Sequence, residues 1–144
     1  MYKEDRRESY LENDHCRIWV TNGILIMEYK PGLVMNIDNA RKMVSDRLKV
    51  SNGITRPLLL KARNFISMDR ATMKFYKTKE VVQHVTCAAF ILDSALGTLA
   101  GNIFLALEKP LVPTKIFKDE QKALEWLEKY KYLKKATFMS GLFY

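Results

Sequence analysis

The stretch from Thr86 to Leu107 constrains the fold more than any other part of the chain, because Asp93 is its only charged residue. Cys87 to Leu92 is a continuous apolar run, which is typical of a strand buried on both faces of a parallel sheet. After Ser94 the apolar residues recur at helical spacing, at positions Leu96, Leu99, Ala100, Ile103, Phe104 and Leu107. The stretch therefore predicts a strand, a tight turn and a helix inside an α/β domain.

A transmembrane helix is the alternative interpretation of this stretch. It is long enough, since a membrane span needs about 20 apolar residues. Gly97 and Gly101 also have the GxxxG spacing that packs helices in membranes. A carboxylate at Asp93 is costly in lipid, however, and further polar residues dilute the run, namely Ser94, Thr98 and Asn102. We therefore predict no membrane span, and we expect the glycines to let the helix approach the sheet closely.

The composition indicates one soluble, cytoplasmic domain. The chain has 144 residues, of which 48% are hydrophobic and 28% charged, and this is enough to build a core. The first residues are charged and include no apolar signal segment. Cys16 and Cys87 are therefore expected to be buried, reduced thiols.

The net charge of +8 raises the question of nucleic acid as a partner. Most lysines and arginines are scattered along the chain beside acidic residues, and only the tract 129–135 is densely basic with interleaved aromatics. Such a tract could contact phosphates. More often it is a solvated helix end whose cations complement the helix dipole. We therefore do not expect a nucleic-acid partner.

The chain is expected to begin with a mobile arm and a hairpin. Residues 1–15 are highly charged and are assigned to the arm. Residues 16–21 and 24–29 are rich in β-formers, and Asn22-Gly23 between them is a strong signal for a two-residue hairpin turn.

A first helix is predicted after this hairpin. Asn36 or Asp38 can cap its start, and Asn52-Gly53 supplies a left-handed stop. The predicted apolar face consists of Ile37, Ala40, Val44 and Leu48, with Met43 beside it. The predicted outer face consists of Arg41, Lys42, Asp46, Arg47 and Lys49.

The remaining elements alternate between strand and helix. The predicted segments are a strand at 57–62, a helix at 69–84, the strand and helix of the central stretch, a strand at 114–117 and a helix from Asp119 to about residue 131. The predicted fold class is thus α/β, with a mixed, mostly parallel five-stranded sheet, an N-terminal hairpin and four helices in the order β-β-α-β-α-β-α-β-α. We expect the domain to span residues 16–131 and an apolar tail to follow at 132–144.

This order of elements, from about Arg17 to Tyr130, resembles the STAS-like family of SpoIIAA-like proteins. The segment Thr114–Phe117 followed by Ala123–Leu127 is similar to the end of small bacterial STAS/SEC14-like proteins. The pieces Arg56-Pro57, Asp93-Ser94, Gly101-Asn102 and Lys109–Lys115 are similar to an uncharacterised family of such proteins in Bacteroidetes. The resemblance implies a SpoIIAA-like fold and brings no established activity with it.

Family members of the SpoIIAA type carry a phosphorylated serine where the third strand meets the second helix. The equivalent sequence here is Met68–Met73, in which Asp69 matches the aspartate of the motif. The phosphoacceptor position falls on Ala71, and the glycines of the motif are missing. The resemblance therefore implies a STAS-like scaffold without the usual phospho-switch.

One candidate ligand site lies beyond the carboxyl ends of the predicted parallel strands, where open α/β sheets bind ligands. Its residues are Arg63, Asn64, Asp69 and Arg70 after one strand, and Asp93 and Ser94 after the next. Together with the starts of two helices, these groups could bind an anion. The alternative is structural, because Asp69, Asp93 and Ser94 can cap helices and Arg63 can pair with an aspartate.

No catalytic, metal-binding or cofactor-binding pattern is present in the sequence. His15-Cys16 lacks partners at metal-ligand spacing, and His84 falls late in a predicted helix. We therefore predict a non-enzymatic binding module that acts through protein–protein contacts. The alternative is a binder of a small anion, nucleotide or lipid at the candidate edge. The apolar tail is expected to pack either on its own domain or on a second copy of the chain, and of the two a homodimer is favoured.

Overall fold

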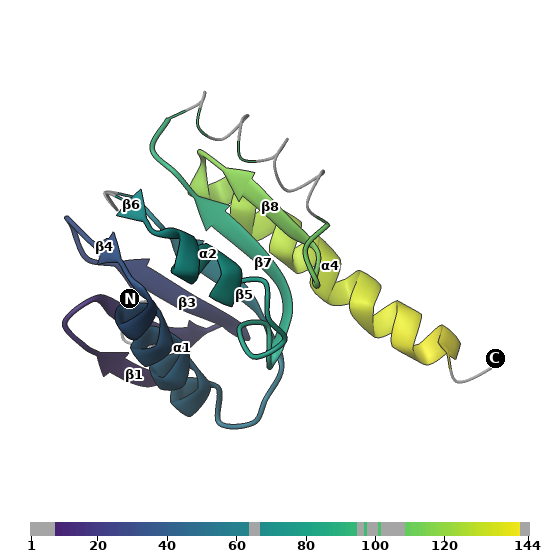
Figure 1. Cartoon of the computed structure of the whole chain (residues 1–144). Coiled ribbons are helices and arrows are strands. Elements are labelled where there is room, and N and C mark those ends of the chain that lie inside the picture. Colours follow the sequence, from purple (N-terminus) through teal and green to yellow (C-terminus); the bar gives the residue numbers. More distant parts are fainter. Residues whose placement is uncertain (1–7, 64–66, 95–96, 98–100, 102–108, 142–144) are drawn as a thin grey trace.

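The computed structural model describes residues 8–63, 67–94, 97, 101 and 109–141 (Figure 1). Its main sheet has the strand order β1-β2-β3-β5-β7-β8. The strands are β1 (Glu8–Glu12), β2 (Cys16–Thr21), β3 (Ile24–Tyr29), β5 (Arg56–Lys61), β7 (Val85–Ile91) and β8 (Thr114–Phe117). The first three are antiparallel, and β5, β7 and β8 run parallel to β3. The expected mixed, mostly parallel sheet with an N-terminal hairpin is confirmed, with six strands rather than five.

The additional strand is β1, which corrects the expectation of a mobile arm for residues 8–12. β1 pairs antiparallel with β2, with a bulge between Glu8 and Leu11. Leu11 packs against the core, and Tyr10 stacks on Trp19 with ring centroids 6.2 Å apart. Only Tyr10 and Leu11 of this polar and charged segment make such packing contacts. The segment nevertheless forms a strand because the backbone of β2 provides hydrogen-bond partners along it. Residues 1–7 of the predicted arm lie outside the described residues.

The hairpin between β2 and β3 forms as predicted. Asn22 and Gly23 both have positive φ angles, 52° and 76°, as a type I′ turn requires. Alternation along the strands then divides the side chains between the two faces of the sheet. One face carries the cluster of Ile18, Leu25 and Met27 under α1 (Ile37–Ser51). The other carries the cluster of Trp19, Ile26 and Leu59 under α4 (Glu120–Gly141).

Helix α1 begins and ends as predicted but buries a wider face. The Asn36 side chain accepts a hydrogen bond from the backbone N–H of Asn39, and Asn52 ends the helix in a left-handed conformation. The prediction that Asp46 and Arg47 lie outside was wrong, because they are only 2% and 3% exposed. Both side chains find polar partners on segments far away in the sequence, described below.

Helix α2 (Arg70–Phe75) is much shorter than the predicted helix at 69–84. A series of turns replaces its second half, and His84 has a positive φ of 61° rather than a helical one. A short parallel pair, β4 (Val34–Met35) with β6 (Ser67–Met68), leads into α2 and was not predicted. In Figure 1, α1 and α2 lie on one face of the sheet and α4 on the other.

Most of the helix predicted after Ser94 lies outside the described residues. Of that segment, Gly97 and Gly101 are described, and both are helical. A Cβ atom at Gly101 would collide with Cδ1 of Ile116 on β8. The expectation that a glycine permits close approach to the sheet is therefore confirmed at Gly101.

Helix α4 covers the second face of the sheet and extends further than predicted. Ala123 and Leu127 are fully buried against the sheet, and the helix continues to Gly141, past the predicted boundary at residue 131 (Figure 1). The apolar side chains of the predicted tail, 132–144, lie outside the described part of the structure. None of the described helices is both long and apolar enough to cross a membrane.

Candidate functional site

The carboxyl edge of the parallel strands brings Arg63 and Asp93 together. Arg63 follows β5 and Asp93 follows β7, and Arg63 Nε lies 3.6 Å from Asp93 Oδ1. The same guanidinium lies 3.9 Å from Glu120 Oε1 and donates a hydrogen bond of 3.4 Å to the Lys118 carbonyl. Three chain segments that are distant in sequence therefore meet at one arginine.

These ion pairs are loose and exposed to solvent. The Arg63 and Asp93 side chains are 39% and 56% exposed, so screening limits each pair to about 0–1 kcal/mol. Lys61 also contacts Glu120, at 3.2 Å. The edge thus holds two cations balanced by two carboxylates, and an incoming anion would have to displace one of those carboxylates.

Asp69 and Ser94 act as helix caps, which is the structural alternative considered for them. Asp69 Oδ1 accepts hydrogen bonds from the backbone N–H of Thr72 at 2.9 Å and from its hydroxyl at 2.6 Å. The bonds from the Thr72 hydroxyl and backbone N–H lower the pKa of Asp69. Ser94 Oγ accepts from the backbone N–H of Gly97 at 2.9 Å. Arg70 is exposed on α2, and Asn64 lies outside the described residues.

The two cysteines are poorly suited to nucleophilic chemistry. Cys16 and Cys87 are completely buried, and burial raises the pKa of each thiol to about 11. Both therefore stay protonated at neutral pH. Among the described residues, no group of three or more His, Cys, Asp and Glu side chains is arranged to hold a metal ion.

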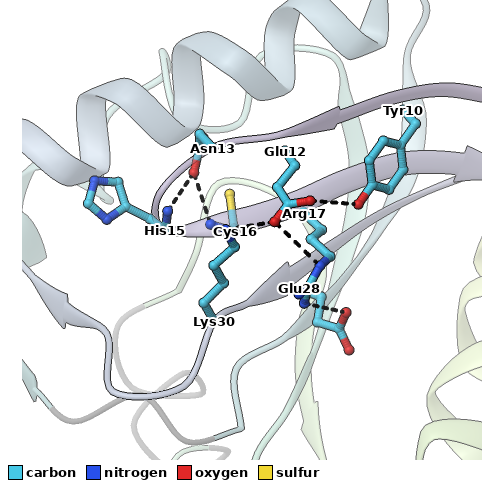
Figure 2. Close-up of polar contacts among 8 residues, drawn as sticks. All are labelled: Tyr10, Glu12, Asn13, His15, Cys16, Arg17, Glu28 and Lys30. Carbon is cyan, nitrogen blue, oxygen red and sulfur yellow. Dashed lines mark hydrogen bonds and ion pairs between the residues drawn. The ribbon is translucent and has the colours of Figure 1, made fainter.

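A small cavity that the sequence did not predict lies beyond the end of β3. Its volume is about 260 Å³, and it is lined by Asp14, His15, Lys30, Pro31, Gly32, Leu33, Val34, Asn36 and Asn39. One wall is the β1–β2 turn, which Asn13 Oδ1 stabilises by accepting from the backbone N–H groups of His15 and Cys16 (Figure 2). The only sequence signal for the opposite wall is Pro31-Gly32.

The charge of the Lys30 ammonium, on a residue that lines this cavity, is offset by an ion pair with Glu12. The ammonium lies 2.7 Å from Glu12 Oε2, and Figure 2 shows it directed towards Glu12 while the His15 ring points the other way. The cavity is also smaller than the roughly 300–1,000 Å³ usual for small-molecule sites. These groups do not select a class of ligand.

A basic surface that also includes an apolar side chain covers α2 and the adjoining side of α1. Arg70, Met73 and Lys74 are exposed, and Met73 is 46% exposed. Arg41 of α1 reaches across to α2, with its Cζ 5.1 Å from the centroid of the Phe75 ring. We call these exposed side chains, Arg41, Arg70, Met73 and Lys74, the basic face. The sequence signal for it is the segment 70–79, which has four cations and no acid.

A family model for a domain of unknown function, DUF7793, matches residues 18–131. The chain belongs to the DUF7793 family. The match covers the sheet from β2 onward together with α1, α2 and the packed part of α4. No curated protein matches the chain significantly.

A solved structure places this DUF7793 chain among SpoIIAA-like folds. The solved structure is that of an uncharacterised protein of the DUF3478 family from Shewanella loihica PV-4, and it is described as having a SpoIIAA-like fold. The two are 17% identical with a TM-score of 0.57, and the match covers 81% of this chain and 98% of that one. At this identity the likeness shows the fold alone, and it confirms the fold implied by the sequence resemblance.

The position expected for a phosphoacceptor offers no accessible hydroxyl in this DUF7793 chain. Ala71, at that position, lies exposed in the first turn of α2. The neighbouring Thr72 is fully buried, and its hydroxyl donates to Asp69. A kinase would therefore have to unfold the start of α2 to reach Thr72.

Proposed function

We propose that this chain is a SpoIIAA-like binding module that acts through contacts with another protein, and that the basic face carries those contacts. The observation that carries the proposal is the exposure of Met73 between Arg70 and Lys74 on a short, well-anchored helix. A central apolar side chain within a polar rim is the usual anatomy of a protein interface, in which Met and Arg are enriched.

The anchoring of α2 supports this assignment. Thr72 and Phe75 are buried beneath the helix, and Asp69 caps its start. These contacts hold the backbone of α2 in one orientation, so its exposed side chains are presented to a partner with little conformational entropy left to lose. The buried, protonated thiols support a binding role over a nucleophilic one.

Binding of a small anion, nucleotide or lipid headgroup at the carboxyl edge is the second candidate. The observation that favours it is the length of the ion pairs of Arg63, 3.6 and 3.9 Å, which an oxyanion could replace. Titration with inorganic phosphate, followed by the amide resonances of Lys61, Arg63 and Asp93, tests this candidate. Absence of saturable shifts there would exclude it.

A homodimer formed through residues 132–144 is a further part of the proposal. Its support is that α4 carries the chain to Gly141, beyond the edge of the sheet (Figure 1). A helix that extends beyond the domain can pair with the same helix of a second copy through one self-complementary surface.

Site-specific photo-cross-linking in the native host tests the proposed protein-binding surface. A photoreactive amino acid replaces Met73 in one variant and Leu111 in a control variant, since Leu111 is also apolar and exposed but lies outside the basic face. We expect a protein adduct specific to position 73. The captured protein, once purified, should bind the wild type and bind Met73→Glu at least about tenfold more weakly, a change of about 1.4 kcal/mol. Equal binding to both would exclude the basic face as the interface.

A further inference from the structure

Positive charge is concentrated on α2 and the turns that follow it. Between Arg70 and Lys79 the chain carries Arg70, Lys74, Lys77 and Lys79 with no acidic residue, and all four cations are exposed. By contrast, the first part of α4 mixes Lys122 and Lys129 with Glu120, Glu125 and Glu128, and a second basic tract follows at 129–135. A local excess of one sign attracts a complementary partner and repels a like-charged one.

Among the described residues, no acid forms an ion pair with a cation of the basic face. The ion pairs formed among the described residues engage Arg17, Lys30, Lys42, Lys49, Lys61, Arg63 and Lys131. Within that described part of the chain, they include none with Arg41, Arg70 or Lys74. Asp69, the acid nearest in sequence to Arg70, is occupied by the backbone N–H and hydroxyl of Thr72.

Two of these cations lie beside one apolar side chain on α2, and a third lies at the border with α1. Because Thr72 and Phe75 point into the core, Arg70, Met73 and Lys74 lie on the outer side of α2 at i, i+3 and i+4 spacing. The contact of Arg41 with the Phe75 ring places a third cation at the border between α1 and α2.

We infer that the basic face binds an acidic segment of the partner protein that also presents an apolar side chain to Met73. The inference rests on the proposed function and adds the chemistry of the partner. Nucleic acid fits less well, since none of the four described side chains of this face is an aromatic ring on which a base could stack. A membrane surface fits less well too, because one exposed methionine is a small apolar area to insert into lipid.

The test uses a short synthetic peptide in which leucines at helical spacing are surrounded by glutamates. A matched peptide carries lysines in place of the glutamates. Titrated into the isotopically labelled full chain at low salt, the acidic peptide should shift the amide resonances of Arg41 and of residues 70–74. Raising the salt to physiological strength should weaken binding about tenfold, because exposed charges are screened.

Two double variants separate the basic face from the net charge of the protein. R70E/K74E reverses two charges on the face, and K122E/K129E makes the same change in net charge on exposed positions of α4. We expect R70E/K74E to bind the acidic peptide at least about tenfold more weakly and K122E/K129E to bind as the wild type does. Because all four positions are exposed, thermal melts should show that both variants fold, and R70Q/K74Q should give an intermediate loss.

Several outcomes would overturn the inference. One is an equal loss of binding in both double variants, and another is a shift pattern centred on α4. A third is binding of phosphatidylserine vesicles to the basic face more tightly than the acidic peptide. If the partner cross-linked at position 73 binds wild type and R70E/K74E equally, the inference is wrong while the proposed function stands. If cross-linking at that position captures no protein, the proposed function itself fails.

Discussion

Arg47 Nη1 on α1 donates a hydrogen bond of 2.7 Å to the backbone carbonyl of Val81, thirty-four residues away in the sequence. Nη2 of the same guanidinium donates to the Gln83 carbonyl at 3.0 Å. Burial lowers the pKa of Arg47, yet an arginine stays charged at any physiological pH. One buried cation therefore connects α1 to the turns between α2 and β7.

Removing this side chain should destabilise the protein. Arg47→Met keeps much of the apolar stem but leaves the buried Val81 carbonyl and the partly buried Gln83 carbonyl without this donor, at a cost of about 2 kcal/mol in the free energy of unfolding. Urea denaturation measures this loss. Arg41→Met is the matched control on the exposed side of α1, and loss of its exposed contact with the Phe75 ring should cost no more than about 1 kcal/mol. Similar urea midpoints for the two variants would contradict the conclusion that Arg47 connects α1 to the turns between α2 and β7.

Asp46 should make stability depend on acid pH. Burial alone raises the pKa of Asp46, but the hydrogen bond from Asn13 Nδ2, 2.8 Å long, and the charges of Lys42 and Lys49 outweigh it and lower the pKa overall. A lowered pKa means that the carboxylate stabilises the fold above the unfolded pKa of about 4, and that this contribution is lost as the pH falls through the folded value.

The comparison with Asp46→Asn tests this pH dependence. At neutral pH the variant should be about 1 kcal/mol less stable than the wild type. The difference between the two should shrink as the pH is lowered below about 4. Denaturant melts at a series of pH values give the result, and a difference that stays constant with pH would show that Asp46 does not titrate in this way.

The cysteines should be unreactive in the folded protein. With pKa values of about 11, about one thiol in a thousand is ionised at pH 8. Cys16 and Cys87 also belong to the two hydrophobic clusters on opposite faces of the sheet, so they do not form a disulfide. Iodoacetamide should modify both rapidly in denaturant and slowly in native buffer, as measured by intact mass. Rapid native labelling would contradict the burial.

Gly101 should tolerate a methyl group only if Ile116 is shortened. Gly101→Ala places a Cβ against Cδ1 of Ile116, and overpacking of this kind costs about 1–3 kcal/mol, offset by up to about 1 kcal/mol of helix propensity. Ile116→Val removes Cδ1. We therefore expect Gly101→Ala to be destabilising in the wild type and neutral or stabilising when it is combined with Ile116→Val. Chemical denaturation of the single and double variants measures this, and equal effects in the two backgrounds would exclude the contact.

Deleting residues 132–144 should convert a dimer to a monomer. Light scattering of the full chain and of the truncated chain, which ends at Lys131, measures this change. Lys131 is retained because its Nζ donates to the Asn22 carbonyl and belongs to the packed part of α4. A monomeric full chain would exclude the homodimer.

Features that depend on neighbouring residues could be predicted from the sequence. The Asn22-Gly23 turn and the cap at Asn36 follow from backbone preferences and short-range hydrogen bonds, and β7 (Val85–Ile91) was predictable from its continuous apolar run. The candidate edge was also predictable in part, because parallel strands end on one side, and Arg63 does meet Asp93 there. Short-range hydrogen bonds of the same kind, accepted from backbone N–H groups three residues ahead, make Asp69 and Ser94 helix caps.

Other features depended on partners that only the tertiary structure supplies. Asp46 and Arg47 look like surface residues in the sequence, yet both are buried. Their burial is stabilised by hydrogen bonds to partners from distant segments: Asn13, thirty-three residues from Asp46, and the Val81 carbonyl, thirty-four residues from Arg47. β1 is a strand because its backbone pairs with that of β2. The turns after α2 are held in place by the hydrogen bonds that Arg47 donates to their carbonyls. A buried polar group is stable only where its hydrogen-bond partners meet it. That meeting is a property of the folded chain, and the local sequence does not encode it.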